Sequence, residues 1–596
     1  MDRLRLLFCL AALFLKAPVL AQTISSFAPA SGNIGTLVTL SGTGLERVTD
    51  VSVSGAPCLI LDKSETTVRF MVMPGAVTGS VGIKAGATIN TSQHFTVTAV
   101  PLNTALQGAK LVDTTGPAVS QGSSIALSAD GNTLAIGTPN DSGSYGSVII
   151  YTRNGTEWRK QARLRGTGAS GRSRQGTSVA LSADGNTLAS GGWRDSFSVG
   201  GRIIGATWIF TRKDSIWTQQ GPKIVGQSDQ YRFARQGASV ALSADGNTLA
   251  VGGRCDTMGM GATWVFKRSG GTWNQQGDCL IGTGREIKGN YSSSEEYRSS
   301  VALSANGNTL AVGVLTDNRA MGAVWIFNRT DGTWMQEGTK LVGVPIGRIG
   351  GYRGNAVSLS ADGKTLAVGA ASISQIDTID YTNSNYTDWG VTWIYIHTDS
   401  GWAQQGDWLI GTGPYRAGGQ GSAVALSADG NTLATTATGT EFMYGSIEGV
   451  TWVFNRTGDT WTQHGWAFRA PGTVGYAAVG SAAAMSADGR TLAIGGPKDN
   501  TSKGATWVFS RASNDVIIPS APEPEFPAFF WPNPSTGSVT ISGGPATGNF
   551  RMIDGAGRIL LNSGYHSGQP IDISVLSTSI YWIQINGQKA IPFLKL

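Results

Sequence analysis

The chain has 596 residues, of which 40% are hydrophobic and 14% are charged, with 83 glycines, 18 tryptophans and four cysteines. It is too long for one ordinary domain, and its net charge of +6 includes no dense Lys/Arg run of the kind that binds nucleic acid. Many glycines together with aromatic and β-branched residues favour an all-β chain of short strands and tight turns.

The first 21 residues predict a signal peptide. A basic MDRLR start precedes an apolar run at 6–15, which is shorter than the roughly 20 residues needed to span a bilayer. The VLA stretch before Gln22 suits cleavage after Ala21. No later segment is long and apolar enough to cross a membrane, so we expect an exported chain that does not span one.

Three cysteines remain after cleavage, which is too few for a disulfide scaffold. A bridge between Cys255 and Cys279 is one interpretation, and two small buried side chains are the other. Both interpretations stay open.

Residues 22–99 predict a small β-domain, in which TLVTLSG alternates and glycines mark the turns. The segment resembles the immunoglobulin-like IPT/TIG family in its SGTGL stretch, its MPGAVTGSVGI stretch and its closing FTV. The resemblance implies a sandwich that serves as a spacer or binding module and performs no chemistry.

A repeat fills residues 102–511. Its marker is the stretch LSADGNTLA, first found at 127–135, which returns roughly every 60 residues, a period typical of repeat architectures. Seven copies occur, and their acidic turn positions are Asp130, Asp184, Asp245, Asn306, Asp362, Asp429 and Asp488.

Each unit divides into four strand-like pieces, which in the third unit are 238–244, 247–253, 261–268 and 272–282. Seven such units predict a seven-bladed β-propeller. The last unit has no fourth piece, and a matching piece stands at 105–116, ahead of the first unit. We therefore expect this N-terminal strand to complete the seventh blade, which closes the ring and removes an open sheet edge.

The repeated acidic positions suit either metal or catalytic sites, or tight turns. The fourth copy carries Asn306, and asparagine keeps a turn but cannot act as a carboxylate. No calcium-loop pattern of the D-x-[DN]-x-[DN]-G type occurs in the repeats. We interpret all seven positions as structural turns and expect no metal and no cofactor.

The units resemble FG-GAP repeats, the bacterial relatives of the integrin α-chain propeller, in segments such as 174–192, 205–212 and 217–221. Two features depart from that family. The leading Phe-Gly has become Gln-Gly or another pair in most units, and the calcium ligands between the second and third strands are missing. The resemblance therefore implies the propeller fold without its calcium.

Two sets of tryptophans recur at fixed places in the units, and we expect both to pack one blade against the next rather than to stack on sugars at the surface. The first set is Trp208, Trp264, Trp325, Trp393, Trp452 and Trp507, and the second is Trp158, Trp217, Trp273, Trp334, Trp402 and Trp461.

Successive links between antiparallel strands fall on alternate faces of a blade. One face carries short, repeated turns, and the other carries long links that differ from blade to blade, among them 228–237, 285–300 and 374–390. A rigid scaffold with one variable loop face is a usual layout for binding. We expect a ligand at Tyr381, Tyr386 and Trp389, while a surface loop without a ligand is the alternative.

Catalysis has little support in the sequence. The four histidines are scattered over different units, and no HExxH, GxSxG, CxxC or P-loop occurs. Four loop carboxylates could supply an acid–base pair, but their spacing does not single out two of them: Glu295, Glu296, Asp377 and Asp380.

Residues 512–528 carry four prolines and predict a stiff linker. Residues 529–596 predict a small β-sandwich and resemble the C-terminal sorting domain of the Bacteroidetes type IX secretion system, in WPNPSTG, MIDGAGRIL and the terminal FLKL. The resemblance implies export by that machinery, followed by release or attachment at the cell surface.

Together these patterns predict a secreted or surface-attached, monomeric and non-enzymatic binding or adhesion protein. Its expected partner is a protein or glycan at the cell surface. Two alternatives remain open: a carbohydrate-binding lectin that uses the same loop face, and a propeller-type polysaccharide hydrolase or lyase.

Overall fold

The computed structural model describes residues 22–97, 109–510 and 529–595, apart from loop segments of which the longest are 228–233, 286–298, 343–349, 375–388, 413–418 and 532–537. The chain divides into two compact units, Met1–Ile518 and Pro519–Leu596. Strand is the main secondary structure of the described residues and helix is almost absent among them, which confirms the all-β prediction. None of the helices among them has the length and hydropathy needed to cross a bilayer.

The immunoglobulin-like domain has the strand order β1-β3-β6-β5-β4-β7-β8-β2. Strand β5 pairs with β4 in its first half and, around a bulge after Ile60, with β6 in its second half, so one strand joins both layers. Val38, Leu40, Phe70 and Phe95 are fully buried between the layers. The elements are β1 (Thr23–Ala28), β2 (Ser31–Gly32), β3 (Leu37–Thr43), η1 (Leu45–Arg47), β4 (Asp50–Val53), β5 (Ala56–Lys63), β6 (Thr67–Met71), β7 (Gly79–Ala85) and β8 (Ala87–Val97).

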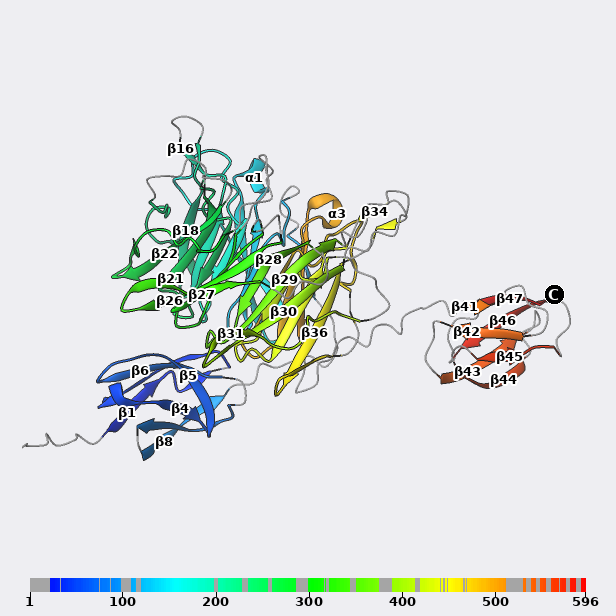
Figure 1. Cartoon of the computed structure of the whole chain (residues 1–596), viewed down its shortest axis with the longest axis horizontal. Coiled ribbons are helices and arrows are strands. Elements are labelled where there is room, and N and C mark those ends of the chain that lie inside the picture. The colour runs from blue at the N-terminus through cyan, green and yellow to red at the C-terminus, as the bar shows by residue number, and fades with distance from the viewer. Residues whose placement is uncertain are drawn as a thin grey trace, which may run out of the picture. The chain divides into compact units, whose positions relative to one another are not determined.

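The repeats form seven four-stranded antiparallel sheets, shown in Figure 1 from cyan through green to orange, which we call blades one to seven in chain order. The first strands contact one another around a ring, and β38 of blade seven returns to β10 of blade one. These first strands are β10 (Ile125–Leu127), β14 (Ser178–Leu181), β20 (Ser239–Leu242), β24 (Ser299–Leu303), β28 (Gly350–Leu359), β32 (Ala423–Leu426) and β38 (Ala482–Met485).

The second and third strands lie in the middle of each sheet. They do not alternate between polar and apolar residues, because each sheet is covered by a neighbour on both sides. The second strands are β11 (Thr133–Thr138), β15 (Thr187–Gly192), β21 (Thr248–Cys255), β25 (Thr309–Val314), β29 (Thr365–Ser374), β33 (Thr432–Ala437) and β39 (Thr491–Gly496). The third strands are β12 (Ser147–Asn154), β18 (Ala206–Lys213), β22 (Met260–Ser269), β26 (Ala323–Thr330), β30 (Trp389–Thr398), β36 (Val450–Thr457) and β40 (Ala505–Ser510).

The fourth strands form the outer edge of the ring. Most are shorter than the sequence predicts: β23 ends at Gln275, Gly277 then adopts a positive φ of 66°, and the chain returns to the sheet at Leu280 as a single bridge to Thr263. The fourth strands are β13 (Glu157–Leu164), β19 (Ile216–Gln219), β23 (Thr272–Gln275), β27 (Thr333–Leu341), β31 (Gly401–Gln404), β37 (Thr460–Gln463) and β9 (Ala109–Leu111).

Blade seven is completed from the N-terminal side of the repeats. Strand β9 pairs antiparallel with β40, with Lys110 opposite Trp507. The first and last repeats therefore share one sheet, and the described part of β9 is a shorter piece of the predicted segment 105–116. Such a clasp protects a sheet edge that would otherwise face solvent.

A closed chain of backbone hydrogen bonds joins the turns of all seven blades. The alanine that follows the marker serine in each turn donates its N–H to the carbonyl of the same alanine in the next blade, at 2.8–2.9 Å. The cycle returns from blade seven to blade one, and we call it the turn ring. Its members are Ala129, Ala183, Ala244, Ala305, Ala361, Ala428 and Ala487.

The first tryptophan set packs blade against blade, as predicted. Trp208 of blade two is fully buried against Val148, Ile150 and Leu164 of blade one. Its indole N–H donates to the carbonyl of Thr167 in the link between the two blades, at 2.8 Å. The other described members of the set are at most 2% exposed, so the set belongs to the core.

The second tryptophan set also joins neighbouring blades, at the outer edge. The ring of Trp217 lies under the guanidinium of Arg212, 5.2 Å from its carbon, and its N–H donates to Gln161 of the preceding blade at 2.8 Å. The arrangement repeats at Trp273, Trp334 and Trp461. These half-buried rings are therefore part of the scaffold rather than a sugar platform.

The second unit contains two sheets, with the orders β41-β42-β45 and β44-β43-β46-β47. Phe550, Met552 and Ile573 are buried within this unit. Its strands are β41 (Phe529–Trp531), β42 (Ser538–Ser542), β43 (Thr547–Ile553), β44 (Ile559–His566), β45 (Pro570–Asp572), β46 (Ser579–Ile585) and β47 (Ile591–Lys595).

Candidate functional site

The propeller has two faces, and the face that carries the marker turns is here called the turn face. In blade one, Asp130 Oδ1 accepts hydrogen bonds from Ser128 Oγ at 2.5 Å and from the Asn132 N–H at 2.9 Å. Asn306 makes the corresponding bonds in blade four, at 2.8 and 2.9 Å. Both side chains therefore close the turn through an acceptor oxygen, which asparagine and aspartate share.

The turn face also contacts the immunoglobulin-like domain within the same compact unit. Met71, 3% exposed, lies against Ala244 and Ala305 of the turn ring. Arg69 Nη1 is 3.4 Å from Asp245 Oδ2. The pKa of Asp245 is lowered against the effect of its burial, first by hydrogen bonds from Ser243 and Asn247 and then by the charge of Arg69. Burial alone would raise that pKa, so the polar contacts outweigh it.

The opposite face carries the links from second to third strand and from fourth strand to the next blade, and is here called the loop face. Four of the second-to-third links begin with an aspartate that is at most 5% exposed, namely Asp141, Asp195, Asp317 and Asp499. Each forms an ion pair with a cation from the outer strand region of its own blade, respectively Arg163, Lys223, Lys340 and Lys110.

The same aspartates fix the links around them. The carbonyl oxygen of Asp195 accepts the Gly205 N–H at 2.9 Å, and its carboxylate accepts the Ser170 N–H at 2.7 Å from the preceding interblade link. Asp499 repeats both bonds, with Gly504 and with Val474. Asp195 and Asp499 thus each join two links of the loop face at their bases. We call the four ion-paired aspartates, with their cations, the aspartate pins.

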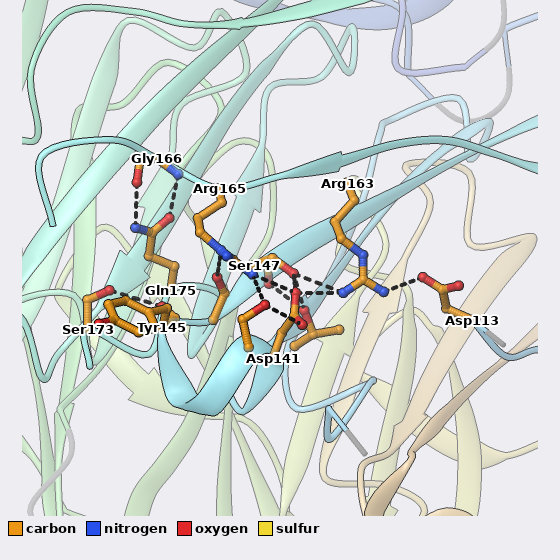
Figure 2. A network of polar contacts seen from close by, with 12 residues as sticks. Asp113, Asp141, Tyr145, Ser147, Arg163, Arg165, Gly166, Ser173 and Gln175 are labelled. Carbon is orange, nitrogen blue, oxygen red and sulfur yellow. Dashed lines mark hydrogen bonds and ion pairs between the residues drawn. The ribbon is translucent and has the colours of Figure 1, made fainter. Parts of the chain in front are cut away.

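Figure 2 shows the pin of blade one, where it meets the closing strand. Arg163 lies between Asp141 and Asp113, the residue two positions after β9, and forms ion pairs with both. Lys160 contacts Asp113 at 2.7 Å, and Arg165 contacts Asp141 at 3.1 Å. The network therefore links blade one to the strand that completes blade seven.

Hydrogen bonds and charges in this network keep the carboxylate of Asp141 ionised. Burial by itself would raise the pKa of Asp141, but hydrogen bonds from Ser147 and Arg163 outweigh it, and the pKa is lowered. Burial opposes the charge of Arg163 in the same way, yet its bonds to Asp113 and Asp141 raise its pKa. Asp141 is therefore an ionised structural group and is unsuited to act as a general acid near neutral pH.

The glutamine of the repeated Gln-Gly pair is buried and binds the backbone of the preceding link. Gln175, 1% exposed, accepts the Gly166 N–H at 2.6 Å and donates to the Gly166 carbonyl at 2.9 Å, so one side chain satisfies both backbone groups. The following Gly176 has a φ of 80°, and a Cβ there would lie 2.3 Å from the Ser147 carbonyl. Gln236 repeats this clamp on Gly226.

The described residues hold a group of arginines near the loop-face end of blades two and three. Trp193 follows β15, is 6% exposed and is surrounded by three guanidinium groups. The guanidinium carbons lie 5.6 Å (Arg174), 5.4 Å (Arg194) and 4.9 Å (Arg235) from the ring centroid. We call these four residues the Trp193 cluster, which the sequence analysis did not anticipate.

The predicted ligand residues lie largely outside the described part of the chain. Tyr381 and Tyr386 fall in the segment 375–388, and Trp389 is the first residue of β30, with its side chain outside the description. The loop carboxylates Glu295, Glu296, Asp377 and Asp380 are also outside it. Among described residues, no cluster of three His, Cys, Asp or Glu side chains has the geometry to hold a metal ion.

Both interpretations of Cys255 and Cys279, a bridge or two separate buried side chains, stay open, because the Cys255 side chain is outside the description. The repeats nevertheless give the pair a structural context. Cys279 stands at the position of Lys223 in blade two, and Cys255 stands at the position of Arg194, next to the pin aspartate. Mass spectrometry of a non-reduced digest decides whether the two are joined.

Two domains match known family models. Residues 23–98 match the model described as the IPT/TIG domain, and residues 530–595 match the secretion system C-terminal sorting domain. Both matches confirm the resemblances stated from the sequence. No curated protein matches the chain. The likeness of the repeats to FG-GAP units stays a prediction.

Several solved structures resemble the chain at low identity. Hydrazine synthase from Kuenenia stuttgartiensis is 15% identical, with 67% of this chain and 98% of that chain covered and a TM-score of 0.42. The periplasmic gluconolactonase PpgL of Pseudomonas aeruginosa is 17% identical, with coverages of 71% and 95% and a TM-score of 0.37. The Cps50 (Swd1) β-propeller domain of Myceliophteria thermophila is 12% identical, with coverages of 68% and 100% and a TM-score of 0.37.

These scores are too low to assign an activity to the chain. Its class follows instead from the two family models and from its own sheets. The chain is a β-propeller protein with an IPT/TIG domain and a type IX sorting domain, and it is secreted or attached to the outer cell surface.

Proposed function

We propose that the protein is a non-enzymatic binding protein whose loop face holds a protein or glycan at the cell surface. The observation that carries the proposal is the unequal construction of the two faces. The turn face repeats the same bonds in every blade and contacts the immunoglobulin-like domain, whereas the pins of the loop face hold only the bases of links that differ in sequence and length.

The buried carboxylates support a binding role over a catalytic one. All four pin aspartates are ion-paired, and the pKa of Asp141 is lowered, whereas a general acid needs a raised pKa. A hydrolase or lyase would therefore have to use carboxylates other than the pins. We keep the enzyme as the alternative to be tested by activity on polysaccharides.

The proposal extends to organisation and site. We propose a signal peptide at 1–21, an IPT/TIG domain at 22–99, a propeller at 102–511, a linker at 512–528 and a sorting domain at 529–596. Tyr381, Tyr386 and Trp389 remain our proposed ligand contacts, and the mature chain is proposed to act as a monomer that the type IX machinery exports.

A loop replacement tests the proposal. Residues 375–388 are replaced by a short Gly-Ser link in the mature chain, and the material captured from the organism's surroundings is compared with that captured by the wild type. The proposal predicts loss of capture with an unchanged melting curve. A matched replacement in the short turn-face link 213–215 should leave capture intact, and equal capture by both variants and the wild type would contradict the assignment.

A lectin is the second candidate, and one observation favours it. Tyr145 is 45% exposed beside the loop-face links, in contrast to the buried tryptophans of the scaffold. A flat aromatic ring next to polar side chains suits the apolar face of a sugar ring. A glycan array with the mature chain separates a lectin from a protein adhesin.

A further inference from the structure

The repeats reveal which residues of the Trp193 cluster the backbone does not require. Arg174 and Arg235 each precede the clamp glutamine and have positive φ angles of 56° and 45°. Ser120 and Ala478 occupy the same place in blades one and seven, with φ angles of 56° and 50°. A small side chain therefore satisfies this backbone position, and the arginines must be explained by what their side chains do.

The same comparison applies to the other two members. Trp193 and Arg194 correspond to Pro139 and Asn140 in blade one, and to Pro497 and Lys498 in blade seven, each directly before the pin aspartate. The pin needs none of these side chains, because Asp141 and Asp499 are held equally well. The cluster of blades two and three thus has no counterpart in blades one and seven.

The charge of the cluster is concentrated in a small volume. Three guanidinium groups lie within 5.6 Å of one ring centroid. The adjacent Asp195 carboxylate is engaged by Lys223 and by the Ser170 N–H. Stacking on an indole holds a guanidinium in a fixed plane, which suits two-point hydrogen bonding to a carboxylate or a sulfate.

An exposed aromatic ring lies next to this charge. The Arg174 N–H donates to the Ser144 carbonyl at 3.0 Å, and the Gln175 N–H donates to the Tyr145 carbonyl at 2.9 Å. The link that contains α1 (Asp141–Ser144) therefore runs alongside the arginine. Figure 2 shows Tyr145 beside Ser173 and Gln175, the two neighbours of Arg174. A ring that is 45% exposed thus accompanies the cationic groups.

We propose that the Trp193 cluster and Tyr145 form a binding site for the carboxylate or sulfate groups of an acidic polysaccharide. The arginines supply planar donors for the anionic groups, and the tyrosine supplies a surface for a sugar ring, a combination that an acidic peptide would not need. The inference rests on the proposed function of the loop face and names the class of its ligand.

The test measures dissociation constants for the full mature chain with four polymers: polygalacturonate, dextran sulfate, neutral dextran and polyglutamate. We expect binding to the first two, weakened by added salt, and none to neutral dextran. The variant R174S/R235S should raise the dissociation constant at least tenfold, and Tyr145→Ser should raise it severalfold. Serine is chosen because Ser120 already adopts this backbone conformation.

A matched control removes two positive charges elsewhere. Arg159 on the outer strand β13 and Lys213 at the end of β18 are both exposed, and R159S/K213S should leave affinity unchanged. Equal weakening by both pairs would show a net-charge effect and overturn the site. Arg194→Ser provides a second test if R174S/R235S fails to fold.

The polymers also separate this inference from the proposed function. Equal affinity for polyglutamate, or for neutral dextran, would overturn the acidic-polysaccharide class. Absence of binding to every polymer would overturn it as well. In each of these cases the loop replacement at 375–388 still decides whether the loop face binds a partner, so failure of one proposal is distinguishable from failure of the other.

Discussion

On the turn face of the propeller every marker turn is built in the same way, whereas on the loop face the links differ from blade to blade beyond their bases. The seven alanines of the turn ring form one unbroken cycle of hydrogen bonds. The aspartate pins occupy four blades. In blade five, Ile373 stands at the aspartate position and Trp408 at the cation position, and in blade six Thr440 and Ala467 stand there. Uniform bonds stabilise a ring, and local pins leave room for links of different length.

The comparison also shows how interactions of one chemical type serve two purposes. A turn-face aspartate such as Asp184 binds the N–H of its own turn, and its loss disturbs one hairpin. A loop-face aspartate such as Asp195 is nearly fully buried, joins two separate links and pairs with a cation. We therefore expect larger losses from the loop-face residues than from the turn-face ones.

Removal of β9, the strand that completes blade seven, should have the largest effect, because it disturbs the sheet and the aspartate pins together. Deletion of residues 102–116 removes β9 and Asp113, exposes the edge of β40 and takes one partner from Arg163. We expect aggregation or loss of most of the free energy of unfolding, because an unpaired edge strand templates association. Light scattering and thermal melting measure this, and an unchanged melting temperature would contradict the closed ring.

The aspartate pins should give the next largest effect. Asp195→Ala breaks the buried ion pair with Lys223. Because breaking such a pair is costly, we expect the free energy of unfolding to fall by about 3–5 kcal/mol. The double variant D195A/K223A resembles blade six, where Ala467 stands at the lysine position, and should recover part of that loss. Urea denaturation measures both, and losses that simply add would show that the two residues do not interact.

The pin of blade one should contribute to stability in a pH-dependent way. The pKa of Asp141 in the folded protein is lowered below its ordinary value of 3.8. Its stabilisation is therefore fully present above that value and is lost as the pH falls through the lowered pKa of the folded state. Asp141→Asn should cost about 1–3 kcal/mol at pH 6 and progressively less toward pH 2. A cost that is constant over this range would contradict the ionised state of Asp141.

The turn-face residues should be more tolerant. Asp184→Asn should leave stability unchanged, because Asn306 makes the same bonds in blade four, while Asp184→Ala should cost about 1–2 kcal/mol. Asp245→Asn should cost up to about 1 kcal/mol more than Asp184→Asn, since it also loses the pair with Arg69. Thermal melting of the three variants measures these differences, and loss of stability in Asp184→Asn would show that the carboxylate charge is required.

The C-terminal unit should affect neither face. Truncation after Pro527 removes the sorting domain, which forms a compact unit of its own from Pro519 onward. We expect an unchanged melting curve for the remainder and retention in the periplasm, since the export signal is lost. Cell fractionation tests this outcome, and truncated protein outside the cell would refute the sorting assignment.

The sequence predicts the repeated parts of this fold well, because comparison of the repeats shows which residues each structural position accepts. The exchange of Asp for Asn306 indicated a turn, and the fixed places of Trp208 and its counterparts indicated packing between blades. The aspartate pins carried a similar signal, since aspartate and cation are absent together from blades five and six. In blades one, two and four the paired residues are about 25 positions apart, as are Asp195 and Lys223, whereas in blade seven the cation is Lys110 from the N-terminal strand. Only the pairing in space shows that these residues act together.

The Trp193 cluster could not be predicted in this way. Arg174 and Arg194 belong to blade two, whereas Arg235 enters from the start of blade three, and the curvature of the ring brings them to one indole. No motif marks three arginines that are separated by about 20 and about 40 residues in a chain of weak net charge. The site is recognised only when equivalent positions of the repeats are compared, because other blades adopt the same backbone conformation without these arginines.

Photo-crosslinking from the two faces tests the central claim most directly. Benzoylphenylalanine is placed either at Ser142, exposed on the loop face, or at Ser215, exposed in a turn-face link, and each mature chain is irradiated in material from the organism's surroundings. The account predicts covalent capture from Ser142 and none from Ser215. Capture from Ser215 alone would contradict the assignment of binding to the loop face.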